Sequence, residues 1–170
     1  KSDGTGGHHG ISLAASLALV QALQTTLDVA SLIDLFGQRI LAWVPFTGLC
    51  YRYPELGLEH CVGGRAMHRC SYGLQLEGEP LGEIEFTHRS RFSEAHQAQL
   101  EALLVHLVHP LRNALCYLRV AEEARRDHLT GAYSRRALDD TLGHELDLAA
   151  RHGWPLALLM FDLDHFKAIN

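Results

Sequence analysis

The hydrophobic pattern of the chain changes its period at residue 49, and this change constrains the fold more than any other feature. Between residues 49 and 88, apolar side chains occupy every second position in three stretches, residues 49–53, 68–76 and 84–88. A Gly78-Glu79-Pro80 segment separates the last two stretches, as a turn does. Alternation of this kind predicts strands with one buried and one wet face, so we expect an antiparallel sheet here.

Helical spacing flanks the alternating region on both sides. Apolar residues follow this spacing over Ile11–Leu27 and again over Leu32–Val44, which Pro45 should end. After the sheet, a long helix is predicted to begin at a Ser93 cap and to run to Arg126. Two helices, a small antiparallel sheet and a long exit helix predict an α+β fold in which helices flank the sheet.

Length, charge and cysteine content limit the class of protein. A chain of 170 residues predicts one domain, or one small domain with a piece of another. The net charge of −5 argues against a nucleic-acid partner, and no apolar run reaches the roughly 18 residues that span a bilayer. Lys1–Gly10 is expected to be a flexible tail. The cysteines show no C-x-x-C spacing, so we expect a cytoplasmic protein with four reduced thiols, Cys50, Cys61, Cys70 and Cys116.

The exit helix carries apolar residues alternately four and three positions apart, as in a coiled-coil seam. They are Leu100, Leu104, Leu107, Leu111, Ala114, Leu118 and Ala121. Before Pro110, which should kink the helix, packing on the sheet and packing on a partner helix both stay open. Beyond Pro110 we expect a partner helix, because no sheet should remain to cover the seam. The first helix has a similar stripe, which predicts a homodimer through the first and last helices: Leu13, Leu17, Val20 and Leu27.

The C-terminal part of the chain is predicted to begin an α/β unit. Ser134 should cap a helix over Arg135–Arg151 that Gly153 ends. The run Leu156–Phe161 is apolar at every position, as expected of a central strand that is covered on both faces. Ligands of α/β folds bind outside the carboxyl ends of strands, so this end of the run suits a nucleotide.

Two aspartates, Asp162 and Asp164, stand where that predicted strand ends. Carboxylates are ligands that Mg²⁺ prefers, alongside phosphate oxygens and water. Lys167 follows within one turn and could place a point charge on a phosphate. An aspartate after a strand is more often a turn or cap residue, so the residues alone leave both interpretations open.

Two segments of this region resemble the GGDEF family of diguanylate cyclases, bacterial signalling transferases that join two GTP molecules into cyclic di-GMP and release two pyrophosphates. Residues 127–136 are similar to the family opening D-x-L-T-G-L-x-N-R-R, with Ala132 and Ser134 as departures. Residues 162–170 are similar to D-x-D-x-F-K-x-I-N-D. The family's Gly-Gly-Asp/Glu-Glu-Phe signature would lie downstream. The resemblance therefore implies a diguanylate cyclase of which this chain alone is catalytically incomplete.

The resemblance implies roles for the residues of the second segment. Asp162 and the Leu163 carbonyl would bind Mg²⁺ or Mn²⁺, while for Asp164 a role at the metal and a role in capping or bracing the turn both stay open. The contacts to GTP would come from the backbone amides of His165 and Phe166, the Lys167 ammonium and the Asn170 side chain. Each family domain holds one GTP, so two domains must face each other, in line with the predicted homodimer.

A second resemblance precedes the first. The hairpin over residues 74–86, followed by Arg91-Phe92-Ser93-Glu94 and an apolar helix, resembles the closing part of a GAF domain. This implies a sensor and dimerisation domain over residues 11–117, a helical linker over 118–126 and the start of a GGDEF domain over 127–170. The middle of the GAF-like part is short, which leaves little room for the helices that cover a GAF ligand pocket, and no ligand is assigned.

Other functions stay open at this stage. A non-catalytic module could bind GTP or cyclic di-GMP without making it, or the GAF-like domain could serve dimerisation alone. His106 and His109 lie one helical turn apart, and His68 shares a strand face with Cys70. These side chains could bind a metal or haem, although packed or surface residues are the more ordinary interpretation.

Overall fold

A computed structural model describes residues 12–127 and 130–161 of the chain. The chain divides into two compact units, with the boundary between Val120 and Ala121. The N-terminal unit contains helices and one antiparallel sheet, as the alternating pattern predicts, and the described part of the second unit contains one further helix after the end of the one that crosses the boundary. None of the helices in the described parts is both long enough and apolar enough to cross a bilayer.

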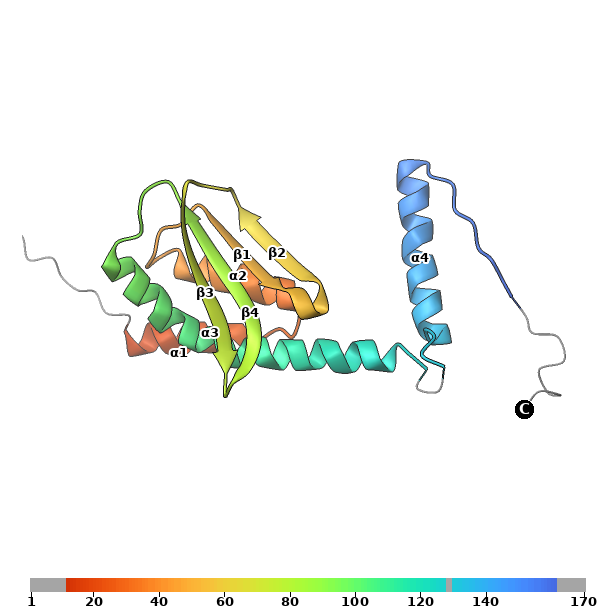
Figure 1. The fold of residues 1–170 in the computed structure, drawn as a ribbon, viewed down its shortest axis with the longest axis horizontal. Helices are drawn as coiled ribbons and strands as arrows, with labels where there is room; N and C mark the ends of the chain where they lie inside the picture. The colour runs from red at the N-terminus through yellow and green to blue at the C-terminus, as the bar shows by residue number, and fades with distance from the viewer. Residues whose placement is uncertain (1–11, 128–129, 162–170) are drawn as a thin grey trace, which may run out of the picture. The chain divides into compact units, whose positions relative to one another are not determined.

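The sheet of the N-terminal unit has four antiparallel strands in the order β2-β1-β4-β3 (Figure 1). Their bounds are Gly48–Tyr53 for β1, Leu58–Gly63 for β2, His68–Leu76 for β3 and Glu79–His88 for β4. The 3-10 helix η1 (Pro54–Leu56) joins β1 to β2, and a tight turn at Gly78 joins β3 to β4. Strand β1 pairs with β4 in the register Gly48↔Thr87, which places β2 at one edge of the sheet.

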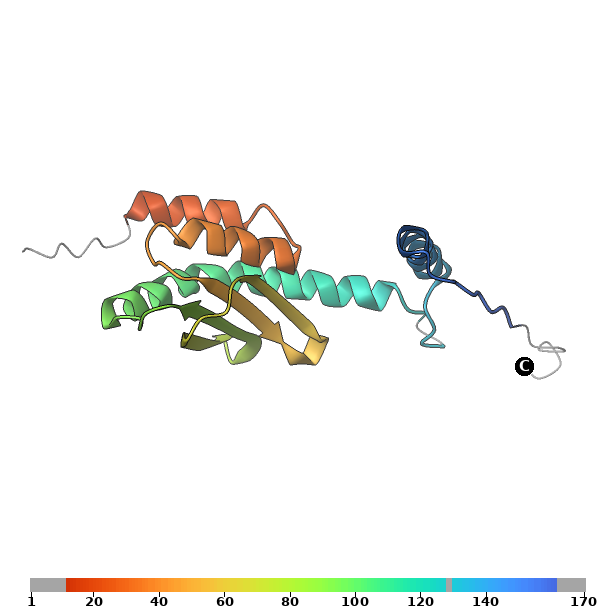
Figure 2. The same cartoon turned by 90° about the horizontal axis from the view of Figure 1, so that it is seen from above.

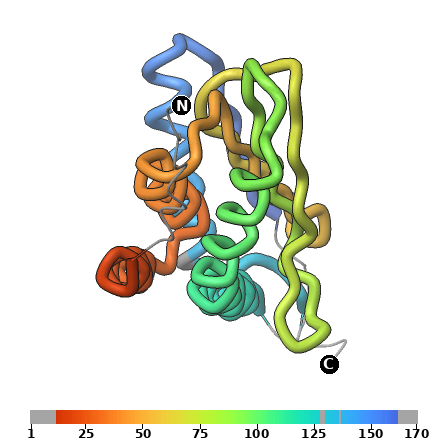
Figure 3. Tube along the Cα trace, turned by 90° about the vertical axis from the view of Figure 1, so that its left-hand side faces the viewer, coloured from red at the N-terminus to blue at the C-terminus, as the bar shows by residue number. Residues whose placement is uncertain are grey.

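Three helices lie on one face of this sheet (Figure 2). They are α1 (Leu13–Leu23), α2 (Val29–Ile40) and α3 (Glu94–Ala124). Viewed along the sheet, α2 and α3 run beside each other and α1 lies on their outer side (Figure 3). No helix of the described part of this unit covers the opposite face, which therefore carries polar and charged side chains.

The core follows from the alternation along the strands. Leu49, Tyr51 and Tyr53 point from β1 toward the helices and are almost fully buried. They meet Phe36 of α2 and Leu107 of α3, which are both inaccessible to solvent. The Tyr51 hydroxyl donates a 2.6 Å hydrogen bond to the Leu81 carbonyl, and burial raises the pKa of this phenol above its ordinary value.

Local capping explains where the helices begin and corrects two predicted bounds. Helix α2 begins at Val29, earlier than the predicted Leu32, because the Asp28 side chain accepts a 2.8 Å hydrogen bond from the Ser31 amide. It ends at Ile40, and a turn rather than helix leads to Pro45. The first helix is shorter than predicted and ends at Leu23. Helix α3 begins at the predicted Ser93 cap.

The leucine seam of α3 packs inside this unit. Leu100, Leu107 and Leu111 are fully buried, and Ala114 is buried as well. The predicted partner helix for Leu111 is therefore wrong. Leu111 is covered because the β3–β4 hairpin is long enough to reach α3 beyond Pro110. The last two residues of the seam, Leu118 and Ala121, are half-buried. Helix α3 changes direction part of the way along its length, as expected for an internal proline (Figure 1).

The second unit contains helix α4 (Arg135–His152), which confirms the predicted helix nearly residue by residue. The Ser134 side chain accepts a 3.3 Å hydrogen bond from the Ala137 amide, and Gly153 adopts the left-handed conformation at the other end. The predicted strand over Leu156–Phe161 is absent. These residues are exposed, with Phe161 at 88%. A strand needs a neighbour for its backbone groups, and the described part of this unit supplies none.

Candidate functional site

The residues that the family resemblance assigns to metal and GTP all lie outside the described residues. This applies to Asp162, Leu163, His165, Phe166, Lys167 and Asn170. Their roles stay predictions. The only support for Mg²⁺ among these residues is that a carboxylate, such as that of Asp162, is a ligand that Mg²⁺ prefers. The structure does describe three regions that bear on function: the turn before α4, a contact network on α3 and a hollow on the open face of the sheet.

The turn before α4 contains most of the first motif and is closed by its own hydrogen bonds. The Asp127 carboxylate accepts bonds of 2.9 Å from both the backbone amide and the hydroxyl of Thr130. The Asp127 amide donates to the Ala132 carbonyl at 2.8 Å, and the Asp127 carbonyl accepts from the Gly131 amide. Gly131 has a φ of 69°, which explains a glycine at this position. Aspartate, threonine and glycine at this spacing therefore build the turn itself.

Arginines before this turn connect it to neighbouring groups. The Arg126 guanidinium lies 4.5 Å from the centre of the Tyr133 ring and donates to the Gly131 carbonyl at 3.1 Å. Arg126 and Tyr133 also form an isolated β-bridge, while Arg125 donates to the Thr141 hydroxyl of α4 at 3.4 Å. The turn is thus fixed from both ends, which favours one entry direction into α4.

A polar network attaches the end of α3 to the sheet within the N-terminal unit. Arg119 donates to Glu79 at 2.9 Å and to the Tyr53 hydroxyl at 2.6 Å. The Tyr53 hydroxyl in turn donates to Glu55 at 2.8 Å, and Arg112 lies 3.5 Å from Glu79. We call these five residues the α3 clasp. Burial and then the hydrogen bond to Glu55 raise the pKa of Tyr53, and the bond to Glu79 raises that of Arg119.

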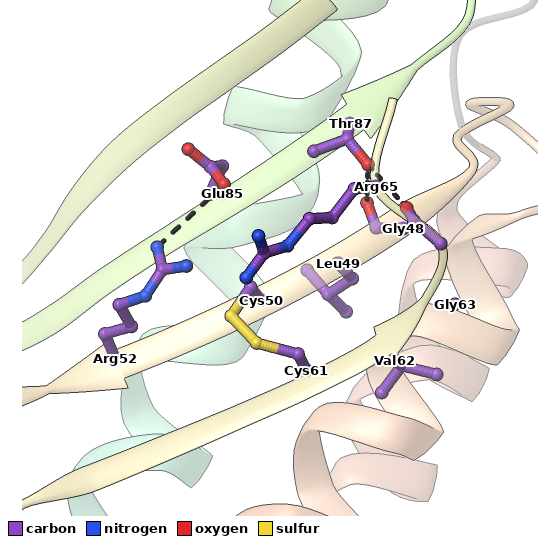
Figure 4. A pocket seen from close by; sticks show the side chains of 11 residues that line it. Gly48, Leu49, Cys50, Arg52, Cys61, Val62, Gly63, Arg65, Glu85 and Thr87 are labelled. Atoms are coloured by element: carbon purple, nitrogen blue, oxygen red, sulfur yellow. Dashed lines mark hydrogen bonds and ion pairs between the residues drawn. A yellow bond between two sulfur atoms is a disulfide. The ribbon is translucent and has the colours of Figure 1, made fainter. Parts of the chain in front are cut away.

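The open face of the sheet contains a hollow of about 150 Å³ between β1, β2 and β4. Six of the residues that line it are Gly48, Cys50, Arg52, Cys61, Arg65 and Thr87 (Figure 4). Its floor is partly backbone. A Cβ atom on Gly48 would collide with the Gly64 carbonyl oxygen, and the buried Thr87 hydroxyl donates to the same oxygen at 3.0 Å.

Two cysteines in this hollow form a disulfide, which corrects the prediction of four reduced thiols. Cys50 of β1 and Cys61 of β2 are direct partners in the strand register, and their sulfurs are bonded. Cys70 and Cys116 are free, as predicted. The pairing was missed because Glu59, His60 and Gly63 give β2 no alternation of apolar residues, so the sequence did not predict this strand. The residues for which metal binding is the less ordinary alternative, His106 with His109 and His68 with Cys70, belong to no group of three or more candidate metal ligands within the described residues.

Comparisons with known proteins agree with the first resemblance. A family model described as diguanylate cyclase, GGDEF domain, matches residues 124–170. The probable diguanylate cyclase DgcC of Escherichia coli is 42% identical over 52 residues, which cover 31% of this chain and 14% of that protein. The diguanylate cyclase DgcS of Shewanella oneidensis is 25% identical over 158 residues, covering 89% of this chain and 50% of that protein. No solved structure matches the chain.

These matches show that the chain is related to diguanylate cyclases, and the GGDEF match begins at the last residue of α3. The chain spans half the length or less of the curated relatives that it matches. The match to DgcS covers 158 residues, so it must include most of the N-terminal unit as well. The GAF resemblance of that unit stays a prediction.

Proposed function

We propose that this chain is the regulatory region and the beginning of the catalytic domain of a diguanylate cyclase, which converts two GTP molecules into cyclic di-GMP and two pyrophosphates. The observation that carries the proposal is the GGDEF match over residues 124–170, which begins at the last residue of α3. The regulatory unit and the start of the catalytic domain are therefore parts of one continuous stretch of chain, with a helix across their boundary.

In the proposed reaction, the 3′-hydroxyl of one GTP attacks the α-phosphate of another. Asp162 and the Leu163 carbonyl would hold Mg²⁺, which neutralises developing charge on the phosphates when it is bound. Lys167, together with the backbone amides of His165 and Phe166, would orient the triphosphate, and Asn170 would select guanine. This chain alone would be inactive, because the downstream family signature supplies further groups of the site.

Two catalytic domains must meet, so the proposal includes a homodimer. Because the seam of α3 is used inside the unit, the dimer is proposed to form through the other apolar side chains of the first and last helices. Leu13 and Leu17 of α1 are 86% and 56% exposed, and Val105 and Val120 of α3 are 63% and 64% exposed. The two valines are fifteen positions apart, which places them within about 60° on one face of the helix.

The test uses the full-length protein, GTP and Mg²⁺, with cyclic di-GMP quantified by chromatography. Wild-type protein should form cyclic di-GMP, and Asp162→Asn should abolish its formation without loss of folded structure. Asparagine caps a turn about as well as aspartate but lacks its charge. Asp140→Asn, a change at an exposed position on α4, serves as the matched control and should keep activity. GTP binding without turnover by the wild type would instead support a non-catalytic binding module.

A further inference from the structure

We propose that Cys50 and Cys61 are a reversible dithiol–disulfide pair that a hydroperoxide oxidises, so that the regulatory unit senses oxidants. The two cysteines differ in exposure. Cys61 lies on the edge strand β2 and is exposed, whereas Cys50 on β1 is only 7% exposed. An oxidant would therefore meet Cys61 first, and Cys50 is already in register to resolve the product.

The surroundings of the pair favour a reactive thiol. The guanidinium groups of Arg52 and Arg65 line the same hollow as both sulfurs (Figure 4). Arg65 has no ion pair within the described residues, so its positive charge is not offset by a bonded carboxylate. A nearby cation lowers the pKa of a cysteine and raises its thiolate fraction, and the thiolate is the nucleophile.

Glu59 is placed to receive protons from the reduced pair. Its Oε1 atom lies 3.8 Å from the Cys50 sulfur and 3.9 Å from the Cys61 sulfur. The same oxygen accepts a 2.9 Å bond from Arg52, which offsets its negative charge. The two thiols and Glu59 could also hold a soft cation. The neighbouring arginines oppose a cation at this point, so oxidation chemistry fits the charges better.

The reaction balances with a hydroperoxide as the oxidant. The Cys61 thiolate attacks a peroxide oxygen and breaks the O–O bond. With hydrogen peroxide, this leaves a sulfenic acid on Cys61 and releases water after proton uptake. The Cys50 sulfur then attacks the Cys61 sulfur, forming the disulfide and releasing a second water. Two thiols and one hydrogen peroxide thus give one disulfide and two waters, and a dithiol reductant reverses the change by exchange.

Reversibility follows in part from the proposed function. GTP is an intracellular substrate, and disulfides in reducing compartments are usually transient, catalytic or redox-sensing. Within the described residues, the edge strand β2 pairs with β1 alone, so we expect the structural effect of reduction to be concentrated in β2. Besides the disulfide, β2 is held by its backbone pairing, the Arg52–Glu59 ion pair and a 2.6 Å contact between His60 and Asp34 of α2. Oxidation would therefore stiffen this edge.

The experiment follows the four thiols of the purified chain by alkylation and mass spectrometry. After the folded protein has been treated with dithiothreitol, all four thiols should react with iodoacetamide, either directly or when the protein is briefly denatured for the alkylation. One equivalent of hydrogen peroxide should then protect Cys50 and Cys61, while Cys70 and Cys116 stay reactive. Hydrogen exchange of residues 58–63 should be faster in the reduced protein. This readout needs no cyclase activity, so its failure is separate from failure of the proposed function.

Variants assign the role of each group. Cys50→Ser should leave a sulfenic acid on Cys61 that dimedone traps, and Cys61→Ser should abolish peroxide-dependent protection. Arg65→Gln should slow oxidation about threefold or more, because the thiolate fraction falls. The matched control Arg39→Gln changes an exposed arginine in the last turn of α2 that does not line the hollow with the sulfurs, so it should oxidise at the wild-type rate.

Three results would overturn the inference. One is a disulfide that dithiothreitol does not open in folded protein, which would make the bond purely structural. Another is a reduced protein in which hydrogen peroxide does not form the Cys50–Cys61 disulfide. The third is stoichiometric binding of Zn²⁺ that protects both thiols from peroxide and is lost in Glu59→Gln, which would identify a metal site instead.

Discussion

Arg119 and Glu79 are forty positions apart in the sequence, yet their side chains are joined by a 2.9 Å ion pair that attaches the end of α3 to the beginning of β4. Both side chains are about one-third exposed, so the pair contributes modestly to the free energy of unfolding. Its position matters more than its strength. Arg119 is two residues before Ala121, the first residue of the second unit, and five residues before Ala124, where α3 ends and the GGDEF match begins.

The α3 clasp should therefore control how firmly the end of α3 is held. Arg119→Ala removes the bonds to both Glu79 and Tyr53, and we expect faster hydrogen exchange of residues 112–120 with little change in the unfolding midpoint. Arg69→Ala is the matched control, because its contact with Glu85 at 3.8 Å lies on the open face of the sheet. Equal exchange in both variants would show that the clasp does not hold the helix.

The burial of the α3 seam gives a second prediction. Leu111→Ala should lower the free energy of unfolding by about 2–5 kcal/mol, because the side chain is fully buried and its loss leaves a cavity. Leu118→Ala should cost about 1 kcal/mol, since Leu118 is half-buried. Urea unfolding at several protein concentrations measures both. If the loss of unfolding free energy in Leu111→Ala varied with protein concentration, Leu111 would instead lie at an interface between chains.

A third prediction concerns the cap of α2. Hydrogen bonding from Ser31 lowers the pKa of Asp28 below its ordinary value of 3.8. The charged cap therefore stabilises the fold fully above this value, and its contribution is lost as the pH falls toward the lowered pKa. Asp28→Ala should cost about 1 kcal/mol at pH 7, while Asn should nearly preserve stability there.

The difference in unfolding free energy between wild type and Asp28→Asn should be constant from pH 5 to 7. Below about pH 4 the wild type should lose stability relative to Asp28→Asn, because its cap becomes protonated. Urea unfolding across this range measures the difference, in which the other carboxylates cancel. A difference that does not change down to pH 3 would contradict the pKa assigned to Asp28.

The proposed dimer is tested on the exposed faces of the helices. Val105→Glu combined with Val120→Glu should convert dimers into monomers by light scattering, because charges would replace the apolar contact. The circular dichroism spectrum should be unchanged, since neither valine belongs to the core. Met67→Glu is the control, at an 86% exposed position in the connection between β2 and β3. A dimer that survives the double substitution would place the interface elsewhere.

The features that could be predicted are those that depend on nearby residues. The bounds of α4 follow from the Ser134 cap and from Gly153, and the β3–β4 hairpin follows from alternation around a glycine turn. The covering of Leu111 could not be predicted in this way, because it depends on how far a hairpin of distant residues reaches along α3. The Cys50–Cys61 pairing likewise requires the register of an edge strand whose composition carries little apolar signal.

The two segments that resemble the GGDEF family differ in the same way. The first motif forms a turn that its own side chains close, so its aspartate, threonine and glycine are explained by local structure. The second motif, from Asp162 to Asn170, lies outside the described residues. Its proposed roles come from the family resemblance and from the chemistry of carboxylate and ammonium groups. The substitution of Asp162 in the full-length protein is the direct test.

Part of the floor of the sheet hollow is backbone, so the charge of the lining side chains can change separately from the shape of that part of the hollow. Gly48, Gly64 and the buried Thr87 hydroxyl form part of its floor, and this part does not depend on the long side chains around it. Arg52 and Arg65 could be exchanged for neutral or acidic residues while this part of the floor keeps its shape. Related proteins could thus acquire different chemical preferences at this position without redesigning the sheet beneath it.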